Sequence, residues 1–482
     1  MNLLKKILIG LLVVVVALTI AGYFILRGDA ADVPFDEVTG TDPKLADPDP
    51  QTIPTVKIAK PVGWKAGEAP IPADGLKVAR FAEGLEHPRT MLTLPNGDVL
   101  VAESNAPARV IAGGSITNFV AGILFSQAGA DVPSPNKIVL LQDADGDGVA
   151  EGKTVLRSDL DSPSGMAWKD GKLYVANHDE VVEFDYVLGS KAITGAPKKL
   201  MDLPGAGNHW MRNLVLNADG TKLYIAVGSA SNIAEGGIEA EQGRAMIHEL
   251  DLSTGRSRPF AAGLRNPNGL GWNPWTGELW TTVNERDMLG SDLVPDYFTN
   301  VPVGAQYGWP WYYWGDVIDD RVEAPMPSGL TGYVRRPEFA MGPHVAALGF
   351  VFTGGGNRMG PEFGQGAFVA RHGSWNRKPP AGYDVVFVNF DARGNPTGKP
   401  VPVLTGFLNK DGTTKGRPTW VAWDKTGALL VSDDTGNIVW RVVKPGAPEN
   451  PAPQRNKGKR MPPIKELLGD PAAAFEENGV PN

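Results

Sequence analysis

The sequence predicts an all-β fold, a six-bladed β-propeller, with an N-terminal transmembrane helix in front of it. One apolar hairpin pattern recurs along the chain, and its copies occupy residues 91–104, 165–178, 213–228, 269–284, 363–373 and 420–434. The chain is rich in turn-forming residues, with 59 Gly and 41 Pro among 482 residues. Between its two ends, no long stretch has the periodicity of an amphipathic helix.

Each copy has the pattern of a β-hairpin. A short apolar stretch leads into a turn containing Asn-Gly, Asp-Gly or Thr-Gly, and a second apolar stretch follows, as around Asn96-Gly97. The copy at 363–373 is looser than the others. Copies about 50–90 residues apart leave room for four-stranded blades with insertions. A sandwich or jelly roll is the competing fold, but it does not repeat one hairpin pattern six times.

The chain divides into four predicted regions. Residues 1–27 form a membrane anchor or signal segment, 28–74 a Pro-rich linker, 75–444 the propeller and 445–482 a Pro-rich tail. Lys5 and Lys6 precede an apolar run from Ile7 to Leu26, which as a helix spans about 30 Å, the thickness of a bilayer core. The alternative is a cleaved signal peptide. Both alternatives export the propeller: it is anchored to the bacterial inner membrane by a single pass, or released into the periplasm after cleavage.

Composition excludes several kinds of chemistry. The chain has no Cys, so disulfides, zinc–thiolate sites and cysteine nucleophiles are absent. Its formal net charge of −8 argues against binding the phosphate backbone of nucleic acid.

Two polar motifs precede predicted blade strands. His209 lies directly before the stretch Leu214 to Leu216, and histidine is suited to act as a general base near neutral pH. Arg265 and Asn266 stand before the next hairpin, where a fixed cation can stabilise charge on a bound oxygen. The alternatives are a structural histidine and a salt bridge between blades.

An acidic loop predicts a calcium site. Its oxygen ligands stand at positions 1, 3 and 5, with Gly148 at position 6, as in calcium-binding loops. The predicted ligands are Asp143, Asp145, Asp147, the carbonyl of Val149, and Glu151. Position 12 is Thr154 rather than Glu, so the loop is not a complete EF-hand. An acidic surface turn is the alternative.

An aromatic run spans residues 307–314. Flat aromatic faces stack on sugar rings or on a planar cofactor, and the same residues are equally suited to a core or a rigid turn.

Together these motifs resemble the pyrroloquinoline quinone (PQQ)-dependent soluble glucose/sorbosone dehydrogenase family, in its sorbosone-dehydrogenase-like branch. The resemblance covers about residues 75–444. It rests on the His209 motif with Arg212-Asn213, the Arg265 motif, residues 284–287, residues 307–310 and the acidic loop.

The resemblance implies roles for particular residues. His209 is the general base, and the substrate carbon passes a hydride to PQQ. Arg265 and Asn266 contact the cofactor's carbonyl oxygens. The remaining implied cofactor-binding residues are Arg212, Asn213, Lys378 and Arg417, and the cofactor's calcium lies near Glu285 and Arg286.

The chain departs from the family's glucose dehydrogenases at three places. Asn208 stands where those enzymes have an acidic residue before the histidine, Thr419 replaces the second Arg of an Arg-x-Arg pair, and the family's cofactor-binding Lys has no clear match, which makes Lys378 a guess. These differences put glucose as a substrate in doubt and leave loss of quinone binding open.

The leading functional hypothesis is therefore a quinoprotein dehydrogenase that oxidises a sugar, a sugar aldehyde or a related alcohol and passes electrons to a quinone or a cytochrome. A calcium-dependent lactonase-type hydrolase and a non-catalytic carbohydrate-binding propeller are the alternatives, because a fold alone does not define a function.

Overall fold

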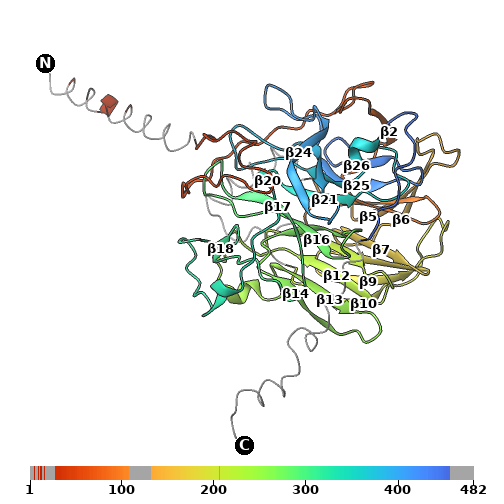
Figure 1. The fold of residues 1–482 in the computed structure, drawn as a ribbon, viewed down its shortest axis with the longest axis horizontal. Helices are drawn as coiled ribbons and strands as arrows, with labels where there is room; N and C mark the ends of the chain where they lie inside the picture. Colours follow the sequence, from red (N-terminus) through yellow and green to blue (C-terminus); the bar gives the residue numbers. More distant parts are fainter. Residues whose placement is uncertain are drawn as a thin grey trace, which may run out of the picture.

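The computed structural model describes residues 28–107, 132–205 and 207–455, with the isolated positions 5, 9, 11–13 and 16. The described chain forms five four-stranded sheets and one five-stranded sheet, all antiparallel, and a small two-stranded sheet. The six large sheets are the blades of the predicted propeller, which is confirmed (Figure 1).

The strands of each blade follow one another in the sequence, with one exception in each of the last two blades. Blade 1 contains β3 (Pro88–Thr93), β4 (Val99–Glu103), β5 (Lys137–Gln142) and β6 (Gly152–Arg157). Blade 2 contains β7 (Gly165–Lys169), β8 (Lys172–Ala176), β9 (Glu180–Asp185) and β10 (Lys198–Asp202). Blade 3 contains β11 (Arg212–Leu216), β12 (Lys222–Val227), β13 (Met246–Asp251) and β14 (Ser257–Ala262). Blade 4 contains β15 (Pro267–Trp272), β16 (Leu279–Val283), β17 (Pro295–Asn300) and β20 (Phe339–Pro343). Blade 5 contains β21 (Ala347–Phe352), β22 (Gly366–Arg371), β23 (Asp384–Phe390), β24 (Pro396–Thr405) and, from before the propeller sequence, β1 (Ile71–Pro72). Blade 6 contains β25 (Pro418–Trp423), β26 (Leu429–Asp433), β27 (Ile438–Val443) and the early strand β2 (Lys77–Glu83). The small sheet pairs β18 (Tyr312–Tyr313) with β19 (Val317–Ile318), and the short 3₁₀ helices are η1 (Ile238–Glu241), η2 (Leu330–Gly332) and η3 (Pro361–Phe363).

The first strands of the blades form a closed ring. Each of β3, β7, β11, β15, β21 and β25 contacts the next, and β25 contacts β3. The N-terminal strand β2 pairs with β27 and completes blade 6, with Arg80 opposite Trp440. Chain segments at both ends of the propeller sequence therefore close the same blade.

Most predicted hairpins form the first two strands of a blade. In blade 1 the Leu94 N–H donates to the Asp98 carbonyl over 2.8 Å, and Gly97 takes a φ of 91° that suits glycine in the turn. Blade 5 explains the looser copy at 363–373. That stretch contains only β22, because its partner β21 lies before a long connection at 353–365.

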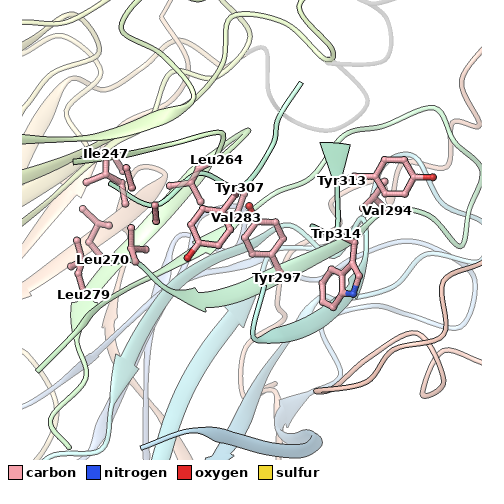
Figure 2. Packing of buried hydrophobic residues seen from close by; sticks show 14 of the residues in the cluster. Ile247, Leu264, Leu270, Leu279, Val283, Val294, Tyr297, Tyr307, Tyr313 and Trp314 are labelled. Carbon is pink, nitrogen blue, oxygen red and sulfur yellow. The ribbon is translucent and has the colours of Figure 1, made fainter. Parts of the chain in front are cut away.

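Buried apolar residues fill the spaces between neighbouring blades. Figure 2 shows the cluster between blades 3 and 4, in which Ile247 and Leu270 pack with Tyr297 and Trp314. Three residues of the aromatic run, Tyr307, Tyr313 and Trp314, belong to this cluster, and Trp309 and Tyr312 are buried as well. Of the two interpretations of this run, the structure supports the core.

The segment at 28–74, predicted as an extended linker, is extended but packed on blades 4 to 6. Gly40 forms a bridge with Ala340, and Pro61 forms one with Thr414. Ala59 and Thr55 are each 2% exposed.

The predicted membrane segment from Ile7 to Leu26 lies almost wholly outside the described residues. Among the residues that are described, no helix has the length and apolar character needed to cross a membrane. Of the predicted Pro-rich tail at 445–482, the structure describes residues 445–455.

Candidate active site

Antiparallel pairing brings the predicted site residues to one face of the propeller. In every blade the first strand begins at the edge where the second strand ends, as the pairing of Arg212 with Val227 and of Pro267 with Val283 shows. Residues just before a first strand and just after a second strand therefore share this edge, which we call the site face. The loops at 208–212, 263–266, 284–292, 372–379 and 416–417 and Asp434 all lie on it.

His209 has a defined tautomer on the site face. Its Nδ1 lies 2.8 Å from the Ser229 carbonyl oxygen and 3.1 Å from the Ser229 hydroxyl. Since a carbonyl only accepts, Nδ1 carries the proton and Nε2 keeps a lone pair. Burial, assisted by the positive charge of Arg265, lowers the pKa of His209 to about 3. The imidazole is therefore neutral at physiological pH and has the form a general base requires.

A glycine allows His209 and Asn266 to approach each other. A Cβ added to Gly228 would lie 2.3 Å from Asn266 Oδ1 and 2.6 Å from His209 Cβ. Any larger residue at 228 would push these two side chains apart. The Asn266 Nδ2 donates to Asn284 Oδ1 over 3.3 Å.

Arg265 is held by acceptors on several loops. Its Nη1 donates to the Glu285 carbonyl at 2.6 Å, and its Nη2 donates to Asp287 at 3.0 Å. Its remaining bonds reach Asn284 O, Asn232 O and Asn232 Oδ1. With all five N–H groups engaged, Arg265 offers the site a fixed positive charge rather than a free donor.

Asp287 connects Arg265 to His344. The His344 Nδ1 lies 3.3 Å from Asp287 Oδ1, and its Nε2 lies 3.0 Å from the Gly290 carbonyl. Although burial alone would raise it, the pKa of Asp287 lies below its ordinary value because Arg265 and His344 stabilise the carboxylate. Burial by itself would lower the pKa of His344, but the neighbouring Asp287 carboxylate raises it above its ordinary value.

Arg212 and Asn213, predicted to bind cofactor, have other surroundings in the structure. Arg212 is fully buried and donates to the carbonyls of His209, Met211 and Pro204, so it shapes the loop that carries the candidate base. The Asn213 side chain is 1% exposed, and neither polar atom of its amide has a hydrogen-bond partner among the described residues.

A second cluster surrounds Asp434, directly after β26. His372 Nε2 lies 2.8 Å from Asp434 Oδ2, and the same oxygen pairs with Arg89. Burial would raise the pKa of Asp434, but these neighbours hold it well below its ordinary value. Arg417 donates to the carbonyls of His372 and Gly373 at 3.1 and 2.9 Å.

Positive and negative groups nearly balance in this second cluster. Burial and then Arg417 lower the pKa of His372 to about 3, so that ring is neutral. Arg89 and Arg417 supply two guanidinium groups, and the carboxyl groups are Asp434 and the neighbouring Asp433, whose pKa burial raises to about 6. Arg89 also lies over the Trp210 ring at 5.4 Å and contacts Met211, which places this cluster next to His209.

Arg89 was not among the residues predicted from the sequence. It lies near the start of the first strand of blade 1, as Arg265 and Arg417 lie near the starts of the first strands of blades 4 and 6. An arginine within two residues of the proline that begins a first strand was the signal that would have found it. Lys378, by contrast, has an exposed side chain, and its backbone N–H and carbonyl bond to Ser291 and Ala31.

The two predicted calcium sites lie on opposite faces. The loop at 143–151 joins β5 to β6 on the face opposite His209, and oxygens of Asp143, Asp145, Asp147 and Glu151 all lie within 4.8 Å of one another. Asp143 also accepts the N–H groups of Gly146 and Gly148, which shapes the loop. This site is too remote for contact with a cofactor beside His209.

On the site face, Glu285 and Arg286 follow β16. Burial raises the pKa of the carboxyl groups of Glu285 and Asp296 to about 7 each. Arg286 pairs with Asp319 rather than with either of them. The Arg286 carbonyl accepts no hydrogen bond from the described residues, and it is an oxygen donor of the kind calcium takes.

A closed six-bladed propeller with a neutral histidine and a cluster of arginines on one face defines the class of protein. The family model described as TrAA12-like matches residues 135–300 and 331–444, which is more than half of the chain. The chain therefore belongs to the TrAA12-like family.

Named relatives of this chain are sugar dehydrogenases. The PQQ-dependent sugar dehydrogenase of Hypocrea jecorina is 22% identical over 422 residues, covering 77% of this chain and 88% of that protein. The aldose sugar dehydrogenase YliI of Escherichia coli is 31% identical over 123 residues, covering 23% of this chain and 31% of the relative. The predicted resemblance to PQQ-dependent soluble sugar dehydrogenases is confirmed, and the sorbosone-dehydrogenase-like branch stays a prediction.

Solved structures share the fold. The iodide structure of the Trichoderma reesei family AA12 protein has a TM-score of 0.63 at 21% identity, covering 78% of this chain and 98% of that one. The holo form of the PQQ domain of Coprinopsis cinerea pyranose dehydrogenase has a TM-score of 0.60 at 20% identity, covering 80% and 100%.

Proposed function

We propose that this chain is a PQQ-dependent dehydrogenase that oxidises a sugar, a sugar aldehyde of the sorbosone type or a related alcohol. The observation that carries the proposal is a neutral histidine with an available Nε2, His209, beside the two guanidinium groups of Arg89 and Arg417. A base and a cationic cradle are what the oxidation of an alcohol next to an anionic quinone requires.

In this proposal His209 removes the hydroxyl proton through Nε2. As that proton leaves, the hydrogen on the same carbon departs with its electron pair, and the substrate becomes a carbonyl compound. When bound, PQQ supplies the acceptor for this hydride. Arg265 stabilises negative charge that develops nearby, and Ser229 keeps Nδ1 protonated throughout the step.

The residues on the site face fit such a cofactor. The guanidinium groups of Arg89 and Arg417 are the donors there that suit an anionic carboxylate. The Nε of Arg89 is buried without a hydrogen-bond partner among the described residues. The buried amide of Asn213 is another polar group whose partner would be a bound molecule or water. Calcium would be held near Glu285 and the Arg286 carbonyl.

Reconstitution tests this function. The purified full chain is titrated with PQQ in the presence of calcium, and dye reduction is then followed with a panel of aldoses and sugar aldehydes. We expect saturable PQQ binding and turnover of at least one substrate. Absence of both binding and turnover would overturn the proposal.

Two observations favour this function over the alternatives. Among the described residues, the side-chain groups close enough to share a metal are Asp143, Asp145, Asp147 and Glu151, and Asp161, His178 and Asp179. A lactonase-type calcium site would need several carboxylates to converge on the site face, and neither group includes Glu285 or Asp287 there. The aromatic run, which suggested carbohydrate binding, is largely buried in the core.

We further propose the setting in which the enzyme acts. The apolar run from Ile7 to Leu26 anchors the propeller to the bacterial inner membrane on its periplasmic side, and a membrane quinone or a cytochrome accepts the electrons. Fractionation of cells that produce the full chain tests this location, with recovery in the soluble cytoplasm as the contrary result.

A further inference from the structure

The segment from Gly28 to Trp64, which we call the strap, runs across the loops that carry the candidate site. It contacts the loop at 284–292, which holds Asp287, and the loop at 372–379, which holds His372. These two loops belong to blades 4 and 5, and both are on the site face. The strap, which precedes the propeller in the sequence, thus contacts two of the loops that form the candidate site.

Backbone groups of the strap bind the loop at 284–292 along its length. The N–H groups of Gln51 and Asp49 donate to the carbonyls of Met288 and Leu289 at 3.0 and 3.1 Å. At the other end of the loop, Asp292 accepts the N–H groups of Asp32 and Val33 at 2.6 and 2.9 Å.

The strap binds the second loop as well. The Lys57 N–H donates to the Trp375 carbonyl at 2.9 Å, and Ala31 N–H donates to the Lys378 carbonyl at 2.8 Å. Arg377 pairs with Asp292 at 3.1 Å, so the two loops also contact each other directly beneath the strap.

One buried amide joins all three segments. The Oδ1 of Asn376 accepts the Met288 N–H at 2.8 Å, and its Nδ2 donates to the Thr55 carbonyl at 2.8 Å. The side chain is fully buried. Met288 follows Asp287, the partner of Arg265, so Asn376 fixes the backbone beside the cation of the site.

The strap also reaches the second cluster through Trp64. The Trp64 indole donates to Asp433 Oδ2 at 2.7 Å, while Oδ1 of the same carboxyl accepts the Arg417 N–H at 2.7 Å. Asp433 is fully buried and also accepts the Gly436 N–H and the Trp440 indole N–H, so Trp64 is one of four donors that set its geometry.

We propose that the strap is a positioning element of the active site, with Asn376 and Trp64 as its positioning residues. It fixes the loop of Asp287 against the loop of His372 and holds the backbone of Arg417, which sets the spacing of the groups that receive the cofactor. This proposal rests on the proposed function. Residues that hold the direct binding residues in place influence ligand affinity, because tight binding requires those residues to be prepositioned.

A single substitution separates the strap contact from the loop contact. Asn376→Asp keeps Oδ1 as acceptor for Met288 but replaces the donor to Thr55 with a second acceptor, which repels that carbonyl. Asn273→Asp is the matched control. Asn273 is equally buried, its Oδ1 accepts the Trp275 N–H and its Nδ2 donates to Gly394, but it lies at a hairpin turn on the opposite face.

The full-chain variants are compared by fluorescence titration with PQQ and calcium. We expect Asn376→Asp to weaken PQQ binding by on the order of 10- to 100-fold, the range typical of groups that orient ligands. Asn273→Asp is expected to bind PQQ as the wild type does at an equal loss of thermal stability. Equal PQQ affinity in the two variants would overturn the positioning role.

Hydrogen exchange separates this proposal from the proposed function. In the absence of cofactor, Asn376→Asp should speed exchange of the amides at 286–292, and Asn273→Asp should not. If the wild type binds no PQQ, the proposed function fails, while the exchange result still decides the role of the strap.

Trp64→Phe gives a second test that keeps an aromatic ring against Trp440 and Phe407. Its control is Trp423→Phe, which removes an indole bond to the Phe352 carbonyl away from the site face. Weaker PQQ binding is expected only from Trp64→Phe, and identical affinities would remove Trp64 from the proposal.

Discussion

The Nδ1 of His209 lies 2.8 Å from the carbonyl oxygen of Ser229. This contact fixes the proton on Nδ1 and leaves Nε2 as the only basic atom of the ring. A general base needs a ring nitrogen with a free lone pair, and in His209 that nitrogen is Nε2 on the site face.

His209→Gln should reduce turnover by about 100- to 10,000-fold, the range for loss of a general base, while PQQ affinity changes little. Steady-state kinetics at saturating cofactor measures the effect. His248→Gln is the control, because His248 Nε2 also contacts a carbonyl, that of Gly243, from within β13. Turnover that survives in His209→Gln would reassign the base.

Low pH should destabilise the protein through His209 and His372. Both have a folded-state pKa of about 3, below the value of 6.5 in an unfolded chain. The unfolded state therefore binds more protons as the pH falls from about 6.5 toward 3, and stability decreases over that window. Urea unfolding at pH 7 and pH 5 should show a smaller difference for His209→Gln than for the wild type. An unchanged difference would mean that folding does not lower the pKa of His209.

Gly228→Ala should separate His209 from Asn266 and lower turnover, because the new Cβ has no space between them. Gly195→Ala is the control, since a Cβ at 195 meets no atom within 4 Å. Kinetics and thermal unfolding of both variants measure the effect. Wild-type turnover in Gly228→Ala would show that the spacing of these side chains is not critical.

Arg89→Met should leave the buried Asp434 carboxylate with too little positive charge and cost about 3–5 kcal/mol of folding stability. Adding Asp434→Asn to it should recover part of that loss, because the uncompensated charge is removed. Urea unfolding of both single variants and the double variant measures the coupling energy. Strict additivity of the two changes would contradict the pairing.

Calcium should stabilise the loop at 143–151 without affecting the site face. In Asp145→Asn/Asp147→Asn, the rise in melting temperature produced by calcium should shrink, while PQQ affinity stays the same. Differential scanning calorimetry with calcium or a chelator measures it. A calcium response equal to that of the wild type would identify the loop as an acidic surface turn.

The sequence by itself determined the blades and the candidate base. Turns such as Asn96-Gly97 and alternating apolar residues are local signals, and they specify hairpins because the strands of a hairpin are neighbours in the chain. His209 and Arg265 were found for the same reason, since each stands beside a recognisable first strand. The acidic loop at 143–151 is likewise a continuous stretch of sequence.

Only the tertiary structure decided which residues meet across blades. Arg89 and Asp434 are 345 residues apart, and Asn376 joins Thr55 to Met288 across distances of 321 and 88 residues. Such pairs have no spacing rule. The first arises when the ring closes and brings blade 6 against blade 1, and the second when the segment before the propeller packs on the loops of blades 4 and 5, which turned a predicted linker into the strap. The structure also showed that the buried Arg212 binds the backbone around His209.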